Sequence, residues 1–268
     1  MEENNIQIYT AETLSDVFYY LKTTPNLKIT GACTQLQQLP EKMLSIRGLK
    51  ELSEITRKEN YIEAGAAVTL GKLALQGKSK LPAFMSEAIM NTATSHIRNI
   101  ATLGGNIYAS PVKGTLYAPL LALDARLVLQ NANETISIPI SKSTENTGNY
   151  LLTKIRIPTD EWDIAEFRRI GESHRLTEKS ASYVFLATVE NDVLTRVRFA
   201  FSGLHSVRFT NLENRLAGSR LPLEKKNIST YITDAGFEYD KYFSDKNYFP
   251  IMKEEFLRLI TYSFKKLS

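Results

Sequence analysis

The densest signal in the chain is Ile97-Arg98-Asn99-Ile100-Ala101-Thr102-Leu103-Gly104-Gly105-Asn106-Ile107. Its centre is a pair of adjacent glycines between a threonine and an asparagine. Glycine allows positive φ and a close approach of the backbone, so such a turn is able to present N–H groups to a phosphate. A glycine pair is more often part of an ordinary tight turn. The stretch alone therefore leaves both interpretations open.

A second turn of small residues lies earlier in the chain, at Gly31-Ala32-Cys33-Thr34-Gln35-Leu36, after a short extended stretch at 27–30. Several backbone N–H groups must converge to bind a pyrophosphate, and bulky side chains would obstruct them. Thr34, Thr102 and Asn106 add neutral donors to the two turns. Two turns of this kind in one region modestly strengthen the case for a diphosphate site, and two ordinary tight turns remain the alternative.

Composition restricts the class of protein. The chain has 268 residues, 43% of them hydrophobic and 23% charged, which is typical of a globular protein of one or two domains, and we favour two. Its single cysteine, Cys33, excludes an internal disulfide and a cysteine-based metal or iron–sulfur site within this sequence. A net charge of +4 with scattered basic residues argues against nucleic acid.

Other kinds of site are not indicated. No apolar run reaches about 18 residues and the N-terminus is polar, so we expect no membrane span and a cytoplasmic location. The G-x-G-x-x-G, P-loop, H-E-x-x-H and G-x-S-x-G motifs are absent. The three histidines, His96, His174 and His205, are too scattered for a zinc site. We therefore predict no metal site and no catalytic side chain.

Periodicity predicts the elements. Helices are expected at 11–23, with Thr10 as the N-cap, and at 69–75, 82–94, 211–217 and 250–266. Strands are expected at 42–46, 60–64, 126–130, 151–158, 181–189 and 194–202, the last two joined by a hairpin turn at 190–192. Because strands precede helices after residue 160, the C-terminal part should be an α+β domain that begins near 158–163.

Together these residues resemble the FAD-binding (medium) subunit of the molybdenum hydroxylases, of the xanthine dehydrogenase and carbon monoxide dehydrogenase type. The strongest match is the stretch 97–107, and the likeness extends over nearly the whole chain. Further landmarks follow in the family's order: Ser110-Pro111, then 120–125, 151–158 and 167–169.

The resemblance implies an α+β fold. It implies a two-part FAD-binding domain of the vanillyl-alcohol oxidase-like (PCMH) type at residues 1–160, with subdomains at about 1–55 and 56–160. A smaller α+β domain with a three-stranded sheet would follow at 161–268.

The same resemblance implies which residues contact FAD: Gly31, Ala32, Cys33, Thr34, Gln35, Leu36, Ala101, Thr102, Gly104, Gly105, Asn106, Ser110, Leu152 and Arg168. Two features depart from the family. Ala32 and Cys33 occupy glycine-like positions, and Lys113 lies in a loop where relatives usually carry an aspartate. We predict that Gly104→Asp abolishes flavin binding by repelling the pyrophosphate.

The function implied is electron transfer. Electrons from iron–sulfur clusters on a partner chain would reach FAD and pass to NAD or a similar acceptor, and a third chain would hold the molybdenum cofactor. Two alternatives remain. The departures at Ala32, Cys33 and Lys113 suggest a structural subunit that has lost FAD, and a stand-alone flavin oxidase is the other possibility.

Overall fold

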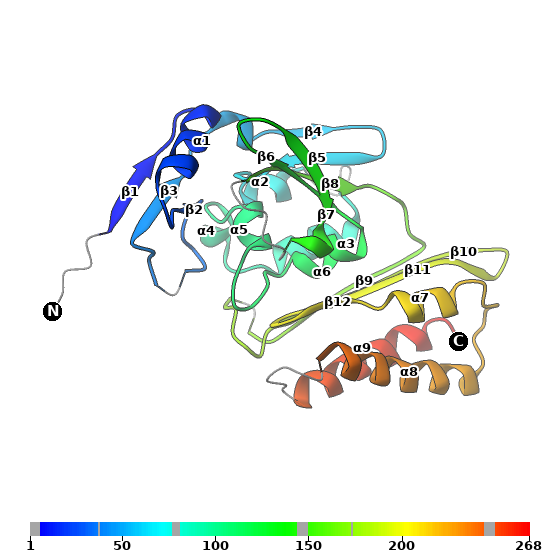
Figure 1. Cartoon of the computed structure of the whole chain (residues 1–268). Coiled ribbons are helices and arrows are strands. Elements are labelled where there is room, and N and C mark those ends of the chain that lie inside the picture. The colour runs from blue at the N-terminus through cyan, green and yellow to red at the C-terminus, as the bar shows by residue number, and fades with distance from the viewer. Residues whose placement is uncertain (1–5, 37, 77–80, 144–149, 173, 244–249) are drawn as a thin grey trace. The chain divides into compact units, whose positions relative to one another are not determined.

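The computed structural model describes residues 6–36, 38–76, 81–143, 150–172, 174–243 and 250–268 (Figure 1). Contacts within the chain divide it into two compact units. The first unit comprises residues 1–81, 93–110 and 124–159, and the second comprises 82–92, 111–123 and 160–268. Within the described ranges, no helix has the length and apolar character needed to cross a bilayer.

The first unit begins with a small parallel sheet. Strands β1 (Gln7–Thr10), β2 (Lys28–Thr30) and β3 (Lys42–Ser45) pair in the order β1-β3-β2. Helix α1 (Leu14–Thr23) buries Val17 in a core with Leu44. The prediction that Thr10 caps this helix is wrong, because Thr10 ends β1 and Thr13 is the N-cap. The Thr13 hydroxyl accepts from the Asp16 N–H, and the Asp16 carboxylate accepts from the Thr13 N–H, which forms a capping box.

A five-stranded antiparallel sheet completes the first unit. Its strands are β4 (Ile55–Arg57), β5 (Tyr61–Gly65), β6 (Arg126–Gln130), β7 (Thr135–Pro139) and β8 (Leu151–Pro158), in the order β4-β5-β8-β6-β7. Alternate residues such as Ile62, Leu127 and Ile155 are buried on one face, as the period of two requires. Short helices accompany the sheets: η1 (Lys50–Leu52), α2 (Leu70–Leu75), α4 (Ser95–Arg98), α5 (Leu103–Ile107) and η2 (Ile140–Lys142).

The second unit is built on a four-stranded antiparallel sheet. Strands β9 (Ile164–Ile170), β10 (Ala181–Glu190), β11 (Val193–Ser202) and β12 (Ser206–Arg208) pair in the order β12-β11-β10-β9. The predicted hairpin joins β10 and β11, with Asn191 and Asp192 both at positive φ. The resemblance implied three strands, and the short β12 on the outer side of β11 makes a fourth.

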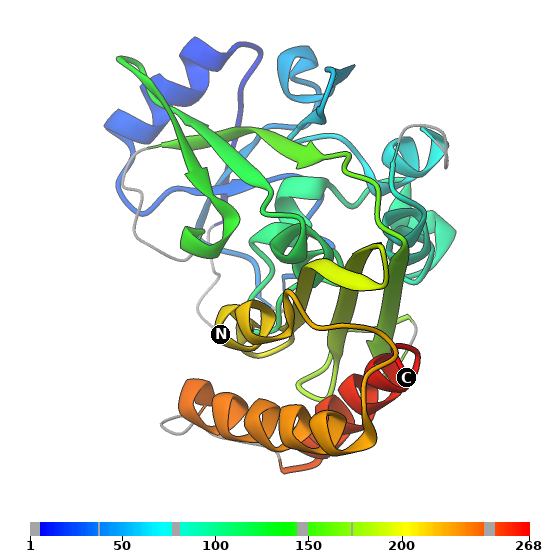
Figure 2. The ribbon, with the colours of Figure 1, turned by 90° about the vertical axis from the view of Figure 1, so that its right-hand side faces the viewer.

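Helices cover both faces of this sheet. Helices α7 (Thr210–Leu216), α8 (Lys225–Phe243) and α9 (Pro250–Lys265) pack against one face, in an aromatic core that includes Phe185 and Phe199 (Figure 2). Helices α3 (Ala83–Met90) and α6 (Tyr117–Ala122) contact the sheet on its other face, where Phe167, Val184 and Leu186 are buried. The second unit therefore has three layers, and segments distant in sequence supply one of them.

Candidate functional site: a cleft lined by two small-residue turns

The two turns singled out in the sequence line one cleft in the first unit. The cleft contains about 620 Å³ of empty space, including the part open to solvent. It is lined by Ile29, Thr30, Gly31, Ala32, Cys33, Thr34, Gln35, Leu36, Thr102, Gly105, Tyr108, Ala109 and Ser110. None of these residues is Asp, Glu, Lys or Arg, so the walls present neutral groups.

The turns are in direct contact at Gly31. A Cβ atom at this position would lie 2.8 Å from Thr102 Oγ1 and 3.0 Å from its Cγ2. That spacing is too short for a larger residue unless the Thr102 side chain or one of the turns shifts. The absence of a side chain at Gly31 is therefore what allows the two turns to form a single wall.

The loop Ala32–Gln35 supplies free donors. Cys33 adopts φ +54°, in the left-handed region, and its carbonyl oxygen accepts from the Leu36 N–H at 3.4 Å. Within the described part of the chain, the N–H groups of Ala32, Cys33, Thr34 and Gln35 have no acceptor. A left-handed residue within a run of free N–H groups is the arrangement that forms anion-binding concavities.

The Gly104-Gly105 turn has a different role from the one expected. Its N–H groups already have acceptors, because the turn folds as the short helix α5 capped by Thr102. Leu103 donates to the Val68 oxygen at 2.8 Å, Gly104 to the Ala66 oxygen at 2.9 Å and Gly105 to Thr102 Oγ1 at 3.1 Å. This turn builds the wall of the cleft but leaves no N–H of these three residues for a ligand.

Gly104 itself is a packing glycine. A Cβ atom there would lie 2.9 Å from the Ala66 carbonyl oxygen and 3.2 Å from the Ala66 Cβ. Gly104 is buried, whereas Gly105 is exposed and lines the cleft. A substitution at Gly104 would therefore act first on the packing of α5 against Ala66, before any effect of charge on a ligand.

The structure brings together nine of the fourteen residues predicted for the site: Gly31, Ala32, Cys33, Thr34, Gln35, Leu36, Thr102, Gly105 and Ser110. Four others lie in the same unit but are buried and are not among the lining residues: Ala101, Gly104, Asn106 and Leu152. Arg168 lies in the second unit, on β9. Its Nη1 donates to the Phe167 oxygen at 2.8 Å, and its guanidinium lies 5.6 Å from the Tyr262 ring centre.

Sequence reasoning missed four lining residues, Ile29, Thr30, Tyr108 and Ala109. Tyr108 had a usable signal, because it directly follows the strongest stretch; in the structure the residue is 42% exposed. Lys113, noted as a departure from the family, belongs to the second unit. Burial lowers the pKa of Lys113, whose ammonium lies 5.0 Å from the Tyr117 ring centre.

These residues fit the diphosphate of FAD. The loop offers N–H donors without acceptors, the glycine at position 31 keeps the approach open, and no carboxylate in the lining would repel the phosphates. The part of the chain that the structure describes contains no group of three His, Cys, Asp or Glu side chains arranged to hold a metal ion.

Two curated relatives show what kind of protein this chain is similar to. Glyceraldehyde dehydrogenase medium chain from Sulfolobus acidocaldarius is 22% identical over 219 residues, covering 76% of this chain and 77% of that one. Indole-3-acetaldehyde oxidase from Zea mays is 28% identical over 202 residues, covering 69% of this chain. This chain spans only 15% of the length of the Zea mays oxidase. It spans 26% and 16% of the length of two aldehyde oxidase relatives from Oryza sativa.

Solved structures confirm the expected fold class. Carbon monoxide dehydrogenase from Hydrogenophaga pseudoflava superposes with a TM-score of 0.80 at 15% identity, over 98% of this chain and 96% of that one. Quinoline 2-oxidoreductase from Pseudomonas putida 86 gives a TM-score of 0.77 at 15% identity, over 98% and 95% of the two chains.

The family described as "FAD binding domain in molybdopterin dehydrogenase" matches residues 4–160, more than half of the 268-residue chain. This match confirms the resemblance seen in the sequence and the choice of cofactor. The chain therefore belongs to the family of FAD-binding domains of molybdopterin dehydrogenases.

Proposed function

We propose that this chain is the electron-transfer subunit of a molybdenum hydroxylase complex in the cytoplasm. It would receive electrons from iron–sulfur clusters on one partner chain, while another partner holds the molybdenum cofactor and oxidises the substrate. The electrons would leave to NAD or a similar acceptor. The observation that carries the proposal is the neutral cleft with its free N–H groups at Ala32–Gln35.

The cysteine content supports placing the clusters elsewhere. Iron–sulfur clusters are held mainly by several cysteine thiolates, and these 268 residues contain one cysteine. A separate subunit is supported by the coverage of the Sulfolobus acidocaldarius protein, whose name describes it as a medium chain and whose length is 77% covered.

Within the cleft, the chain's own groups bind and orient the cofactor. The N–H groups of Ala32–Gln35 would hold the diphosphate, and the contact between Gly31 and Thr102 would keep the two turns together. When bound, FAD supplies the two-electron redox chemistry. Cys33 and Tyr108 are the only lining residues with titratable side chains among those the structure describes. The cleft therefore has little means of proton transfer, and its task is binding.

The direct test measures FAD binding by the purified full chain. Binding is monitored through flavin absorption and flavin fluorescence. Ser110 is exposed and lines the cleft, so Ser110→Asp adds a charge without a packing conflict. At a few ångströms in a partly hydrated cleft, repulsion between the carboxylate and the diphosphate should weaken FAD binding about tenfold or more. The asparagine of Ser110→Asn has nearly the same shape as the aspartate but carries no charge. The Asn variant should therefore bind FAD with an affinity within about threefold of that of the parent chain.

Equal affinities of the Asp and Asn variants would contradict the placement of the diphosphate in this cleft. Failure of the parent chain to take up added FAD would overturn the proposed function itself.

The partners are tested by purifying the complex from the source cells with a tag on this chain. Co-purification of a cysteine-rich chain and of molybdenum and iron in fixed ratio would support the proposal. An active chain that purifies alone, without either metal, would instead favour the stand-alone flavin oxidase. Reduction of added NAD by the intact complex would identify the acceptor.

A further inference from the structure

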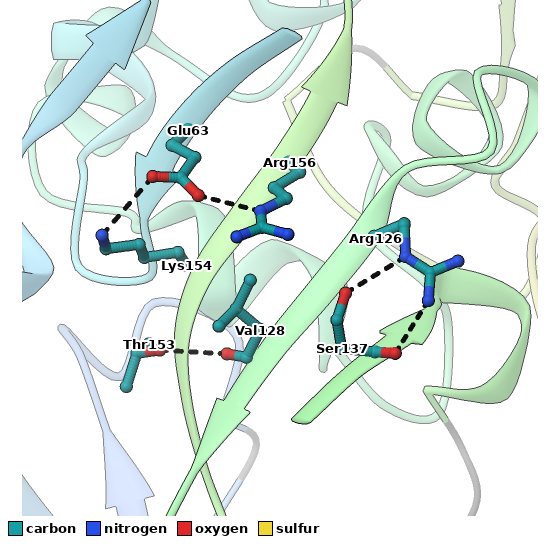
Figure 3. A network of polar contacts seen from close by, with 7 residues as sticks. All are labelled: Glu63, Arg126, Val128, Ser137, Thr153, Lys154 and Arg156. Carbon is teal, nitrogen blue, oxygen red and sulfur yellow. Dashed lines mark hydrogen bonds and ion pairs between the residues drawn. The ribbon is translucent and has the colours of Figure 1, made fainter. Parts of the chain in front are cut away.

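Four charged side chains form a row on the polar face of the five-stranded sheet. Glu63 on β5, Arg156 and Lys154 on β8, and Arg126 on β6 lie on this face, and we call them the basic row (Figure 3). Strand register places Glu63 opposite Arg156, and Arg156 opposite Arg126. Three cations and one carboxylate give the row a formal charge of +2.

Within the basic row, the Glu63 carboxylate contacts only the two cations on β8, Arg156 and Lys154. Arg156 Nε donates to Glu63 Oε1 at 2.8 Å, and Lys154 Nζ lies 3.4 Å from Glu63 Oε2. Burial raises the pKa of Glu63, but the hydrogen bond from Arg156 and the nearby positive charges outweigh this and hold the pKa below its ordinary value. Glu63 is therefore ionised at neutral pH and compensates about one of the three cations.

Among the residues that the structure describes, no carboxylate contacts Arg126. Its Nε donates to Ser137 Oγ at 3.1 Å and its Nη2 to the Ser137 oxygen at 2.8 Å, both uncharged acceptors on β7. Its neighbour across the β6–β8 ladder is Arg156, another cation. Like charges directly opposite each other destabilise a sheet, and Glu63, which pairs with Arg156 from β5, compensates only one of these two cations.

The two guanidinium groups retain donors. Nη1 of Arg126 and both Nη groups of Arg156 have no acceptor within the described part of the chain. The side chains are accessible, since Arg126 is exposed and those of Lys154 and Arg156 are 47% and 40% exposed. The row therefore combines uncompensated charge, free planar donors and access from solvent.

We propose that the basic row is a docking surface for a protein partner that presents carboxylates. A carboxylate placed between Arg126 and Arg156 would accept their free N–H groups and remove the like-charge repulsion, and a second would pair with Lys154. Guanidinium groups bind carboxylates through parallel hydrogen bonds, which also fixes the orientation of the partner.

A nucleic acid fits this surface less well than an acidic protein. Nucleic-acid affinity comes from many phosphate contacts along an extended basic stripe, whereas the row has three cations with a carboxylate among them. Glu63 would repel a phosphate chain that lay along the row. The inference concerns a surface separate from the cleft residues, so it does not depend on the bound cofactor.

The test measures binding of a fluorescent poly-L-glutamate peptide to the full chain at low salt. Arg126→Gln combined with Lys154→Gln removes two charges from the row and leaves the Arg156–Glu63 hydrogen bond intact. We expect about tenfold weaker binding, because complementary charge at the contact is lost. The matched control is Arg47→Gln combined with Lys50→Gln, which removes two exposed charges elsewhere in the first unit and should change binding by less than about twofold.

If both double variants lose the same amount of peptide affinity, only the net charge of the chain matters and the proposal is overturned. The proposal is also overturned if neither double variant loses affinity. A duplex DNA that binds more tightly than poly-L-glutamate, and loses affinity in the same double variant, would overturn the protein partner in favour of nucleic acid. Thermal unfolding and FAD uptake are measured on every variant. Normal FAD uptake with lost peptide binding separates this surface from the proposed function.

Discussion

At the scale of single residues, Cys33 is the most informative position in the cleft. It adopts φ +54°, a conformation that costs roughly 1–2 kcal/mol for a residue with a Cβ atom and little for glycine. This cost comes from the backbone of the loop, so it applies even when no ligand is bound.

We expect Cys33→Gly to be more stable than Cys33→Ala by about 1 kcal/mol, since both variants lack the thiol and only one retains a Cβ. Glycine also gains freedom in the unfolded chain, which offsets part of this gain. Urea unfolding of the two variants measures the difference. A more stable alanine variant would show that the loop relaxes away from the left-handed conformation.

Glu63 gives a prediction for pH dependence. Its pKa is lower in the folded protein than in the unfolded chain, because the Arg156 hydrogen bond and the Lys154 and Arg156 charges outweigh burial. Between the two pKa values the unfolded chain binds more protons. The stabilisation is therefore complete above the unfolded value, about 4.3, and is lost as the pH falls through the folded value.

Glu63→Gln should accordingly lower the free energy of unfolding by about 1–3 kcal/mol at pH 7, because it leaves Arg156 without its anion. The difference in unfolding free energy between the parent chain and the variant should shrink as the pH falls toward the pKa of Glu63 in the folded protein. Urea unfolding at neutral and acid pH checks this, with the exposed Glu51→Gln as the control. A deficit that stays constant with pH would contradict the assignment.

Residue patterns located the cleft but not the role of each residue in it. Both turns were identifiable from their glycines and threonines, and nine predicted residues line the cleft. The sequence could not reveal that the space beside Gly104 is filled by Ala66, nor that Asn106 turns inward. Both facts arise because α5 packs against the segment after β5, a contact between residues about 40 positions apart that short-range patterns do not encode.

At the scale of elements, the cap of α5 connects helix stability with the cleft. Thr102 Oγ1 accepts from the Gly105 N–H, and the same side chain contacts Gly31 in the other turn that lines the cleft. Thr102→Ala should cost about 1 kcal/mol of unfolding free energy through the lost cap. We also expect weaker FAD binding, because the wall beside Gly31 loosens.

Thr102→Ser keeps the capping oxygen and should retain most of the stability and the affinity. Thermal unfolding and FAD titration of both variants provide the measurement. If the serine variant is as impaired as the alanine variant, the methyl group and not the cap determines the geometry of the wall.

Most elements with clear periodicity were predicted correctly, and the failures have physical causes. Helix α8 went unpredicted because it contains Gly236 and several β-branched residues, among them Ile228 and Thr230, which have low helix propensity. Packing with α9 and the sheet stabilises it instead. Strand β9 contains Glu166, Arg168 and Arg169, and its pairing with β10 determines its structure.

At the scale of the whole molecule, the two units share the chain in an interleaved way. Helices α3 and α6 belong by contact to the second unit, although first-unit segments follow each of them in sequence. A fragment of residues 160–268 therefore lacks one layer of its own fold. Without α3 and α6, the sheet face that carries Phe167, Val184 and Leu186 would be exposed to water.

We expect this fragment to bind a hydrophobic dye and to unfold without a cooperative transition, since burial of each such side chain is worth about 1.5–3 kcal/mol. Circular dichroism and dye fluorescence, compared with the full chain, measure this. A fragment that melts cooperatively and remains monomeric would contradict the layer assignment.

The interleaving also determines what happens while the protein is being made. Helices α3 and α6 leave the ribosome before the strands that cover them, and the last of the long strands, β11, ends at Ser202. At ordinary rates of synthesis, that delay is on the order of several seconds. During it, Phe84 and Leu120, both buried in the finished protein, lack the sheet that α3 and α6 cover in the native fold, so apolar surface stays exposed on the newborn chain for longer than in a protein with contiguous domains.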